Sequence, residues 1–201
     1  MTLKEVKVNF IVDTAKELFF KDSIFNVTIK DIADKAGVGE MTVYRYFKKK
    51  QNIVLAVALK LQQEITSYFD LSKGNTGFEK LSIFYSSFLT IFKESIKHYQ
   101  FIRDFDSYML EFKDDANLGN YEASLDDFKH VFFDAYDLGL KDGSVKNIEH
   151  SVMFYYSSTH SLLELCKKLS SVGLLRQDEL LEKHQEIQTL IDVFLSYLKN
   201  S

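Results

Sequence analysis

The sequence contains no proline and no tryptophan, only one cysteine and only eight glycines. Most of the residues that interrupt helices and shape turns are therefore missing, which favours long helices over strands. The single cysteine, Cys166, excludes an intramolecular disulfide and a four-cysteine zinc site, and such sparing use is typical of a reducing compartment. We therefore predict an all-α fold without a disulfide.

Long apolar runs are missing as well, and we expect no secretory leader. The run from Ile53 to Leu59 is much shorter than the roughly 20 apolar residues that span a bilayer. Charged residues near the start, such as Lys4 and Glu5, stand where a leader needs its apolar stretch. We expect no membrane helix and a cytoplasmic location. With 46% hydrophobic and 27% charged residues, the chain has an ordinary globular composition rather than a disordered one.

The charge of the chain is unevenly distributed, although the net charge is only −4. Residues 1–50 hold 10 Lys and Arg against 7 Asp and Glu, whereas residues 51–201 hold 15 against 22. The first quarter of the chain is therefore suited to meet phosphate, and the remainder repels it.

Local sequence signals in the first 50 residues predict three helices. Apolar residues recur at helical spacing over residues 3–21, which predicts a first helix that ends before a break at residues 22–27. Thr28, with Asp31 three residues later, predicts a capped start of a second helix. Gly37 is suited to the left-handed backbone conformation that often ends a helix, so we predict that the second helix ends there. We predict that a third helix starts at Gly39.

The last two of these helices have the spacing of a helix-turn-helix unit. Ala33 is small enough for a helix crossing, Gly37 follows in the turn, and Val43 lies six residues further on. Alone this pattern is weak, because two packed surface helices also produce it. The third helix, GEMTVYRYFKKK, adds hydroxyl, aromatic and basic side chains that suit phosphate contacts, namely Thr42, Tyr44, Arg45, Tyr46, Lys48, Lys49 and Lys50.

The segment TIKDIADKAGVGEMTVYRYFKKKQNIVLAV, with AKELFFKD before it, resembles the N-terminal domain of TetR-family transcriptional regulators. This resemblance covers roughly residues 7–58, and KDGSVKNIEHS resembles the family's connection into its penultimate helix. Two groups of residues depart from the family pattern. Ser23 and Ile24 replace the usual glycine and aromatic residue, and Gly39, Glu40 and Met41 replace a common serine, lysine and small residue.

The resemblance implies a three-helix helix-turn-helix DNA-binding domain over residues 1–50 and a helical effector-binding and dimerisation domain over residues 51–201. It implies that the phosphate contacts come from Thr28, Tyr44, Tyr46 and Lys50. It implies that Glu40, Met41, Thr42 and Arg45 lie on or near the base-facing surface, and Gly39 and Lys48 complete the predicted DNA-binding set. Glu40 either weakens DNA affinity by its charge or accepts a hydrogen bond from a cytosine amino group. We expect Phe47 to pack in the core.

Helical periodicity continues through the remainder of the chain. The predicted helices cover residues 51–70, 78–97, 99–113, 119–138, 149–171 and 178–199, with the clearest loops at 72–77 and 141–144. The middle of the chain is rich in aromatic residues, most of which we expect in the core. The resemblance also implies an effector site between helices, for which we predict Phe105, Tyr108, Met109, Phe112, Phe128, Phe132, Tyr156 and His160.

The last two predicted helices each carry an apolar stripe that suggests self-association. In the final helix the stripe consists of Leu180, His184, Ile187, Ile191, Phe194 and Leu198, widened by Leu181, Leu190 and Leu195. In the helix before it, the stripe consists of Val152, Tyr156, Thr159, Leu163 and Cys166. One such face per helix can be satisfied inside a monomer. Two such faces, together with the resemblance to the TetR family, predict a homodimer with a four-helix interface. A homodimer in turn predicts a near-palindromic operator.

Catalytic motifs are missing. The pairs Asp126 with His130 and His160 with Glu164 have a spacing that suits two metal ligands, but it is also common for surface pairs on helices. We expect no enzyme, metal or cofactor. The predicted function is a ligand-responsive DNA-binding regulator, most simply a repressor that a small, largely apolar effector releases from double-stranded operator DNA. The alternatives are a helical protein that binds a small molecule or a protein partner, and a helical enzyme with a metal at His130 or His160.

Overall fold

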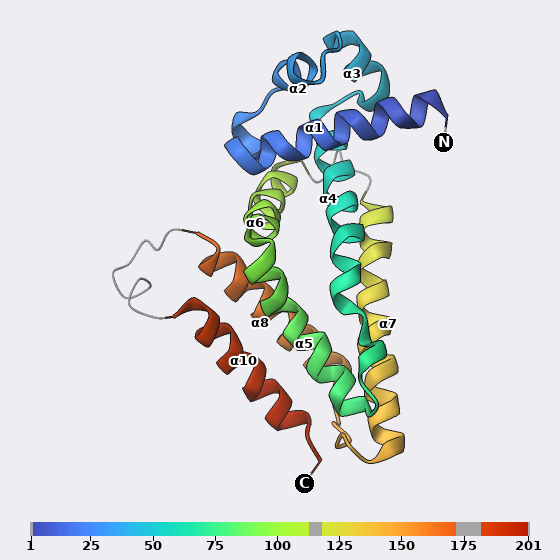
Figure 1. The fold of residues 1–201 in the computed structure, drawn as a ribbon, viewed down its shortest axis with the longest axis vertical. Coiled ribbons are helices and arrows are strands. Elements are labelled where there is room, and N and C mark those ends of the chain that lie inside the picture. Colours follow the sequence, from blue (N-terminus) through green and yellow to red (C-terminus); the bar gives the residue numbers. More distant parts are fainter. Residues whose placement is uncertain (1, 113–117, 172–181, 201) are drawn as a thin grey trace. The chain divides into compact units, whose positions relative to one another are not determined.

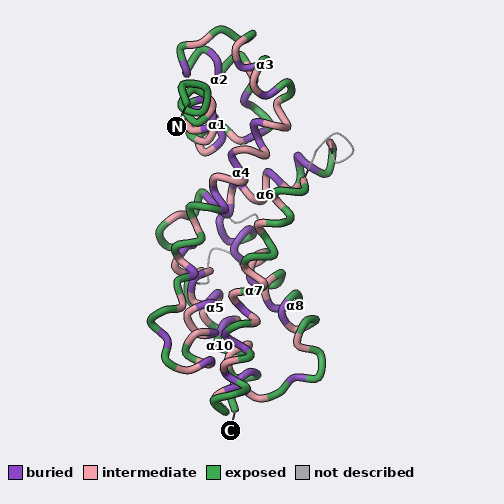
Figure 2. Tube along the Cα trace, turned by 90° about the vertical axis from the view of Figure 1, so that its right-hand side faces the viewer, coloured by how far each residue is buried: buried purple, intermediate pink, exposed green. Residues whose placement is uncertain are grey.

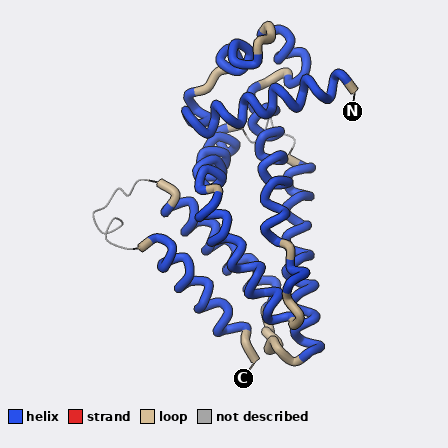
Figure 3. Tube along the Cα trace, viewed as in Figure 1, coloured by secondary structure: helices blue, strands red, loops and turns tan. Residues whose placement is uncertain are grey.

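The computed structural model describes residues 2–112, 118–171 and 182–200, and the regular elements of this part of the chain are helices (Figure 3). The prediction of an all-α fold is thus confirmed. The helices, labelled as in Figure 1, are α1 (Leu3–Asn26), α2 (Ile29–Ala36), α3 (Glu40–Phe47), α4 (Lys50–Thr66), α5 (Gly77–Glu94), α6 (Ile96–Glu111), α7 (Gly119–Asp142), α8 (Ser151–Leu169) and α10 (Lys183–Leu198), with short 3₁₀ turns η1 (Ser67–Phe69) and η2 (Leu71–Lys73).

The chain divides into two compact units. The first unit comprises Met1–Gln63 and Gln100–Glu122, and the second comprises Glu64–Tyr99 and Ala123–Ser201. The first unit therefore contains α1 to α3, most of α4 and most of α6. This division follows compactness. The division into functional domains after residue 50 remains a prediction.

Local sequence signals define α2 and its connection to α3. Thr28 is the N-cap of α2, where its Oγ1 accepts a hydrogen bond from the Asp31 amide at 3.1 Å. The Asp31 carboxylate in turn accepts one from the Thr28 amide at 2.8 Å. Gly37 ends the helix at φ 64°, and its amide donates to the carbonyl groups of Ala33 and Asp34. The predicted cap and the predicted left-handed glycine are both confirmed.

The end of α1 differs from the prediction, which placed a break over residues 22–27. The helix continues to Asn26, and one residue inside it, Ser23, leaves the helical region with φ 67° and ψ 154°. The hydroxyl of Ser23 donates a hydrogen bond of 2.6 Å to Asp104 Oδ2 on α6. The helix resumes because Ile24 and Val27 are buried and hold the following turn against the core.

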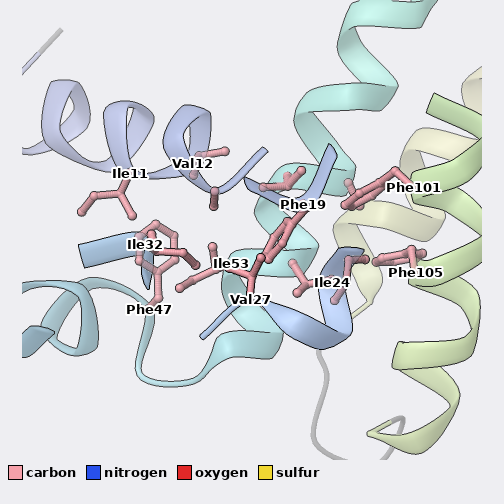
Figure 4. Close-up of a cluster of buried hydrophobic side chains, with 14 of the residues drawn as sticks. Ile11, Val12, Phe19, Ile24, Val27, Ile32, Phe47, Ile53, Phe101 and Phe105 are labelled. Atoms are coloured by element: carbon pink, nitrogen blue, oxygen red, sulfur yellow. The ribbon is translucent and has the colours of Figure 1, made fainter. Parts of the chain in front are cut away.

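The core of the first unit combines aliphatic and aromatic side chains from several helices, as Figure 4 shows. Ile11 from α1, Ile32 from α2 and Ile53 from α4 are all buried there. Phe19 of α1 lies 6.3 Å from Phe101 of α6, measured between ring centroids. The side chains that α1, α2, α3, α4 and α6 contribute to this cluster fix α2 and α3 on the rest of the unit.

The second unit is built around aromatic rings packed edge to face or tilted against one another, and around one very close helix crossing. Phe132 of α7 packs against Phe84 and Tyr155, with ring centroids 5.5 Å and 5.1 Å away. At the crossing of α5 and α7, Gly77 and Gly139 are so close that a Cβ atom on Gly77 would lie 2.1 Å from the amide nitrogen of Gly139. Only glycine permits this approach of the two backbones.

The remaining helix boundaries follow the prediction with shifts of a few residues. The predicted helix over residues 51–70 ends earlier, at Thr66, because the chain continues in the two 3₁₀ turns. Helix α7 extends through Asp142 into the loop predicted at 141–144, and Asp142 Oδ2 accepts a hydrogen bond of 2.8 Å from the amide of Gly77, the first residue of α5. In the last helix, residues 178–181 of the prediction lie outside the described residues. Along each helix, buried and exposed positions recur within single turns (Figure 2).

Candidate nucleic-acid interface

Helix α3 has one side in the core and the opposite side open. Val43 and Phe47 are buried, with Val43 at 0% exposure. Because successive residues turn by about 100° in an α-helix, Met41 and Arg45 lie on the side opposite Val43, about 200° away in each direction. Met41 is 79% exposed and Arg45 is exposed. The outward side of α3 is therefore formed first of all by Met41 and Arg45.

The other predicted base-facing residues flank this pair. Thr42 is half-buried, and Glu40 and Gly39 are exposed at the start of the helix, where Gly39 caps without a side-chain bond. By the helical rotation, Glu40 lies only about 60° from Val43 and so points to the side rather than outward. The guanidinium of Arg45 lies over the Tyr46 ring, with its carbon 5.1 Å from the centroid.

Three of the predicted phosphate contacts lie near the surface of the first unit. Thr28 is exposed at the start of α2, Tyr44 is 43% exposed on α3, and Tyr46 is half-buried against the core. The hydroxyl of Thr28 also donates to Asp31 Oδ2 at 2.6 Å. The Thr28 side chain and amide hold the pKa of the Asp31 carboxyl below its usual value, so Asp31 is negatively charged near neutral pH.

Lys50, predicted as a phosphate contact, has partners inside the first unit. Its ammonium group donates a hydrogen bond to the carbonyl oxygen of Ile24 and lies 5.2 Å from the centre of the Tyr108 ring. Burial lowers the pKa of Lys50, while the nearby charge of Asp31 acts in the opposite direction. In this conformation Lys50 joins α4 to the end of α1 and to α6, a role that its position in a basic run does not reveal.

The turn between α3 and α4 has an unusual backbone at Lys48. This exposed residue has φ 62° and ψ −44°, and the amide of Lys49 donates to the carbonyl of Phe47 at 2.7 Å across it. A non-glycine residue rarely adopts such a tight turn. The Asn52 side chain supports it, because its amide nitrogen donates to the same Phe47 carbonyl at 2.6 Å. The turn thus leaves Lys48 and Lys49 exposed directly after α3.

Two features of the first unit were not predicted from the sequence. The Ser23 to Asp104 hydrogen bond joins residues 81 positions apart, so no local pattern reveals it. The ion pairs of Lys35 with Glu17, at 2.9 Å, and of Lys60 with Asp13 hold two lysines of this unit beside carboxylates, and no local pattern predicts these pairings.

The eight predicted effector residues do not gather in one place. Phe105, Tyr108 and Met109 are buried in the core of the first unit, and Phe112 packs against that core. Phe132 is buried in the core of the second unit, with Phe128 packed against it. Tyr156 and His160 are exposed on α8. An open groove of about 900 Å³ between α8 and α10 is lined by other residues, including Glu164, Lys168, Glu186, Leu190 and Val193.

The stripes predicted for self-association are used largely inside the chain. On α10, Ile187, Ile191 and Leu198 are fully buried, because α10 packs against α5 and α8 within the second unit. Leu180 and Leu181, which belong to the stripe predicted on the final helix, lie outside the described residues. On α8, Cys166 is buried. Two residues of the stripe predicted on α8, Val152 and Tyr156, are exposed, as are three apolar residues outside the predicted stripes, Met153, Val193 and Tyr197.

The described residues offer no cluster for metal chemistry and no membrane span. Among residues 2–112, 118–171 and 182–200, no group of three or more His, Cys, Asp or Glu side chains is placed to hold a metal ion. In the same part of the chain, none of the helices combines the length and the apolar character that crossing a bilayer requires. Burial raises the pKa of the Cys166 thiol to about 12, which leaves it protonated and unreactive near neutral pH.

Known proteins are similar to this chain in the sequence around the candidate site and in the fold. Residues 11–57 match the family described as "Bacterial regulatory proteins, tetR family". The chain is 35% identical over 65 residues to the uncharacterised HTH-type transcriptional regulator YvkB of Bacillus subtilis (strain 168), an alignment that covers 32% of this chain and 34% of that protein.

Two solved structures are similar over nearly the whole chain. One is the ketosteroid transcriptional regulator KstR2 of Mycobacterium tuberculosis, with a TM-score of 0.67 and 14% identity over 96% of this chain and 95% of that one. The other is a TetR-family regulator from Rhodococcus sp., described as putative, with a TM-score of 0.71 and 13% identity over 94% and 98% of the two chains. At such identities these similarities concern the fold.

Proposed function

Because residues 11–57 make this chain a member of the TetR family of bacterial regulatory proteins, we propose that it binds double-stranded operator DNA and regulates transcription in response to a small molecule. The observation that carries this proposal is the geometry of α3. Its inward side is held in the core by Val43 and Phe47, and its outward side presents Met41 and Arg45. A short helix held in this way, with basic residues at its end, is suited to enter the major groove.

The phosphate contacts are proposed to come from the start of α2, from α3 and from the residues directly after α3. The residues are Thr28, Tyr44, Tyr46, Lys48 and Lys50. Hydroxyl and ammonium groups bind phosphate oxygens regardless of base sequence, and these contacts fix the position of the protein on the duplex. Base preference is proposed to come from Gly39, Glu40, Met41, Thr42 and Arg45. Substituting Thr42 or Glu40 by Ala is therefore expected to change sequence preference.

The effector is proposed to be small and largely apolar. Phe105, Tyr108 and Met109 lie in the same core as α1 and α4, so a ligand that displaces them changes the packing that positions α2 and α3. Such a ligand lowers operator affinity if it binds the DNA-incompetent arrangement better, by about 1.4 kcal/mol for each tenfold loss of affinity. This makes the protein a repressor in our proposal. Mass spectrometry of the native protein tests for a ligand that purifies with it.

The chain is proposed to act as a homodimer through α8 and α10. Apolar side chains that stay exposed on these helices, such as Met153 of α8 and Val193 of α10, supply a face that a second copy can cover. A dimer places two copies of α3 on one duplex, so the operator is expected to be a near-palindrome. Sedimentation at micromolar concentration tests this, and a monomer there contradicts it.

The direct test of DNA binding is a gel shift with duplex DNA from the region upstream of the protein's own coding sequence. We expect a retarded complex that weakens as salt is raised and that protects a near-palindromic site from nuclease cleavage. Such a regulator acts where the DNA is, which places it in the cytoplasm in our proposal. If no duplex is retarded at low salt while a small molecule is found bound, the protein is instead a helical ligand-binding protein.

A further inference from the structure

Met41 is the most exposed large apolar side chain in the part of the chain that the structure describes, at 79%. A single exposed apolar residue is normal on a protein surface, so exposure alone indicates nothing. Its position is the informative point, since Met41 lies in the first turn of α3 on the side opposite the buried Val43. This side also carries Arg45, one turn further along.

The two outward residues recognise different features of DNA. The guanidinium of Arg45 offers several N–H donors in a fork, which suits the two acceptors on the major-groove edge of guanine. Its place over the Tyr46 ring, 5.1 Å from the centroid, limits how freely it moves. Met41 has no N–H or O–H donor and only a weak sulfur acceptor, so it recognises an apolar feature. The apolar feature on the base edges of the major groove is the 5-methyl group of thymine.

We propose that Met41 is a specificity-determining residue that packs on the 5-methyl group of a thymine in each half-site. The inference rests on the proposed DNA-binding function and adds the base class that α3 selects. Met41 and Arg45 are four residues apart, about 6 Å along the helix, whereas successive bases are about 3.4 Å apart along the duplex. The thymine therefore lies within about two base steps of the guanine that Arg45 binds. Glu40, turned to the side of α3, lies outside this pair.

The first experiment selects binding sites from a random double-stranded DNA library with the full-length chain. We expect a thymine enriched near a guanine in both halves of the selected sites. The Met41→Ala variant is expected to lose the thymine preference while keeping the guanine preference. A matched control is Leu110→Ala, which also removes an exposed apolar side chain of the first unit, 72% exposed on α6, and is expected to select the same sites as the wild type.

The second experiment replaces the selected thymine by deoxyuridine, which removes only the methyl group. Burial of a methyl group contributes about 0.8 kcal/mol, so the wild type is expected to bind the uracil duplex about fourfold more weakly for each half-site changed. Met41→Ala is expected to bind the thymine and uracil duplexes equally. The wild-type measurement changes the DNA and not the protein, so it does not depend on the folding of a variant.

The outcomes separate this inference from the proposed function. If the library yields bound duplexes without a thymine preference, or if the wild type and Met41→Ala lose the same affinity with uracil, Met41 does not recognise thymine, although DNA binding stands. If no duplex of the library is retained at low salt, the proposed function fails and this inference fails with it.

Discussion

The two compact units of this chain are specified in different ways. In the first unit, the candidate site is positioned by local features, whose residues are close together in the sequence. Examples are the Thr28 and Asp31 cap and the left-handed Gly37. In the second unit, contacts between distant segments dominate, such as Phe132 with Phe84 and Gly77 with Gly139. A function that depends on one short helix can therefore be derived from sequence, whereas a site between packed helices cannot.

The sharpest test of this contrast is the glycine crossing in the second unit. In Gly77→Ala, the new Cβ would lie 2.1 Å from the amide nitrogen of Gly139 and 2.5 Å from the Ala135 carbonyl oxygen, so the backbones of α5 and α7 must separate. We expect the free energy of unfolding to fall by about 3 kcal/mol or more. Urea unfolding followed by circular dichroism measures it.

The matched control for this substitution lies in the first unit. At Gly39 nothing lies within 4 Å of an added Cβ, and Gly39→Ala is expected to change the free energy of unfolding by less than about 1 kcal/mol. If Gly77→Ala is as stable as the control, the close crossing of α5 and α7 is wrong.

The buried His98 of the second unit predicts a pH dependence of stability. Its Nδ1 has no hydrogen-bond partner among the described residues, and burial lowers the pKa of His98 from 6.5 to about 4. Between these two pH values the unfolded chain binds a proton that the folded protein does not. Stability is therefore fully present above pH 6.5 and falls as the pH is lowered towards 4, by up to about 1.4 kcal/mol per pH unit.

The variant His98→Leu removes this titration, so its stability is expected to fall less steeply than that of the wild type between pH 6.5 and 5. The control is Leu125→Ala, which changes an exposed residue of α7 without removing a titrating group and is expected to keep the wild-type slope. Equal slopes for the wild type and His98→Leu would show that His98 is protonated in the folded protein.

In the first unit, Ser23 tests whether a strained residue is held by a long-range partner. At φ 67° and ψ 154°, Ser23 adopts a conformation that glycine adopts far more easily. Both Ser23→Gly and Ser23→Ala remove the hydrogen bond to Asp104, so their difference isolates the backbone. We expect the glycine variant to be more stable by about 1 to 2 kcal/mol in thermal or urea unfolding. Equal stabilities would mean that the chain has another conformation at Ser23.

The smallest expected effect concerns Lys50, for which the sequence and the structure suggest different roles. As a phosphate contact, Lys50→Ala weakens binding to all duplexes alike and reduces the salt slope of binding by about 1 for each contact removed. If Lys50 only holds Ile24 and Tyr108 in place, stability falls and the slope stays unchanged. Affinity measured against salt concentration separates the two roles, and we expect the reduced slope.

Much of the first unit could be predicted because its signals are local. The helix start at Thr28, the end at Gly37 and the inward direction of Val43 follow from neighbours within one or two turns. The prediction was incomplete where a residue distant in the sequence determines the local structure. The continuation of α1 past Ser23 depends on Asp104 and on burial of Ile24, and the place of Lys50 depends on Tyr108.

The second unit was predictable as a set of helices but not in its pairings. Periodicity identifies the apolar side of a helix without naming the helix that covers it. The stripe of Ile187, Ile191 and Leu198 suggested a dimer face, but α5 and α8 cover it within the chain. Similarly, Phe105 and Phe132 look alike in sequence, yet they lie in the cores of different units.

Above all, we propose that the first unit binds duplex DNA through phosphate and groove contacts. The most direct measurement is the fluorescence anisotropy of a labelled duplex titrated with the full-length chain, repeated between about 50 and 200 mM salt. The claim predicts that the logarithm of affinity falls linearly with the logarithm of salt concentration, by about 0.9 for each phosphate contacted. An affinity that is no greater at low salt than at high salt, for every duplex tried, would contradict it.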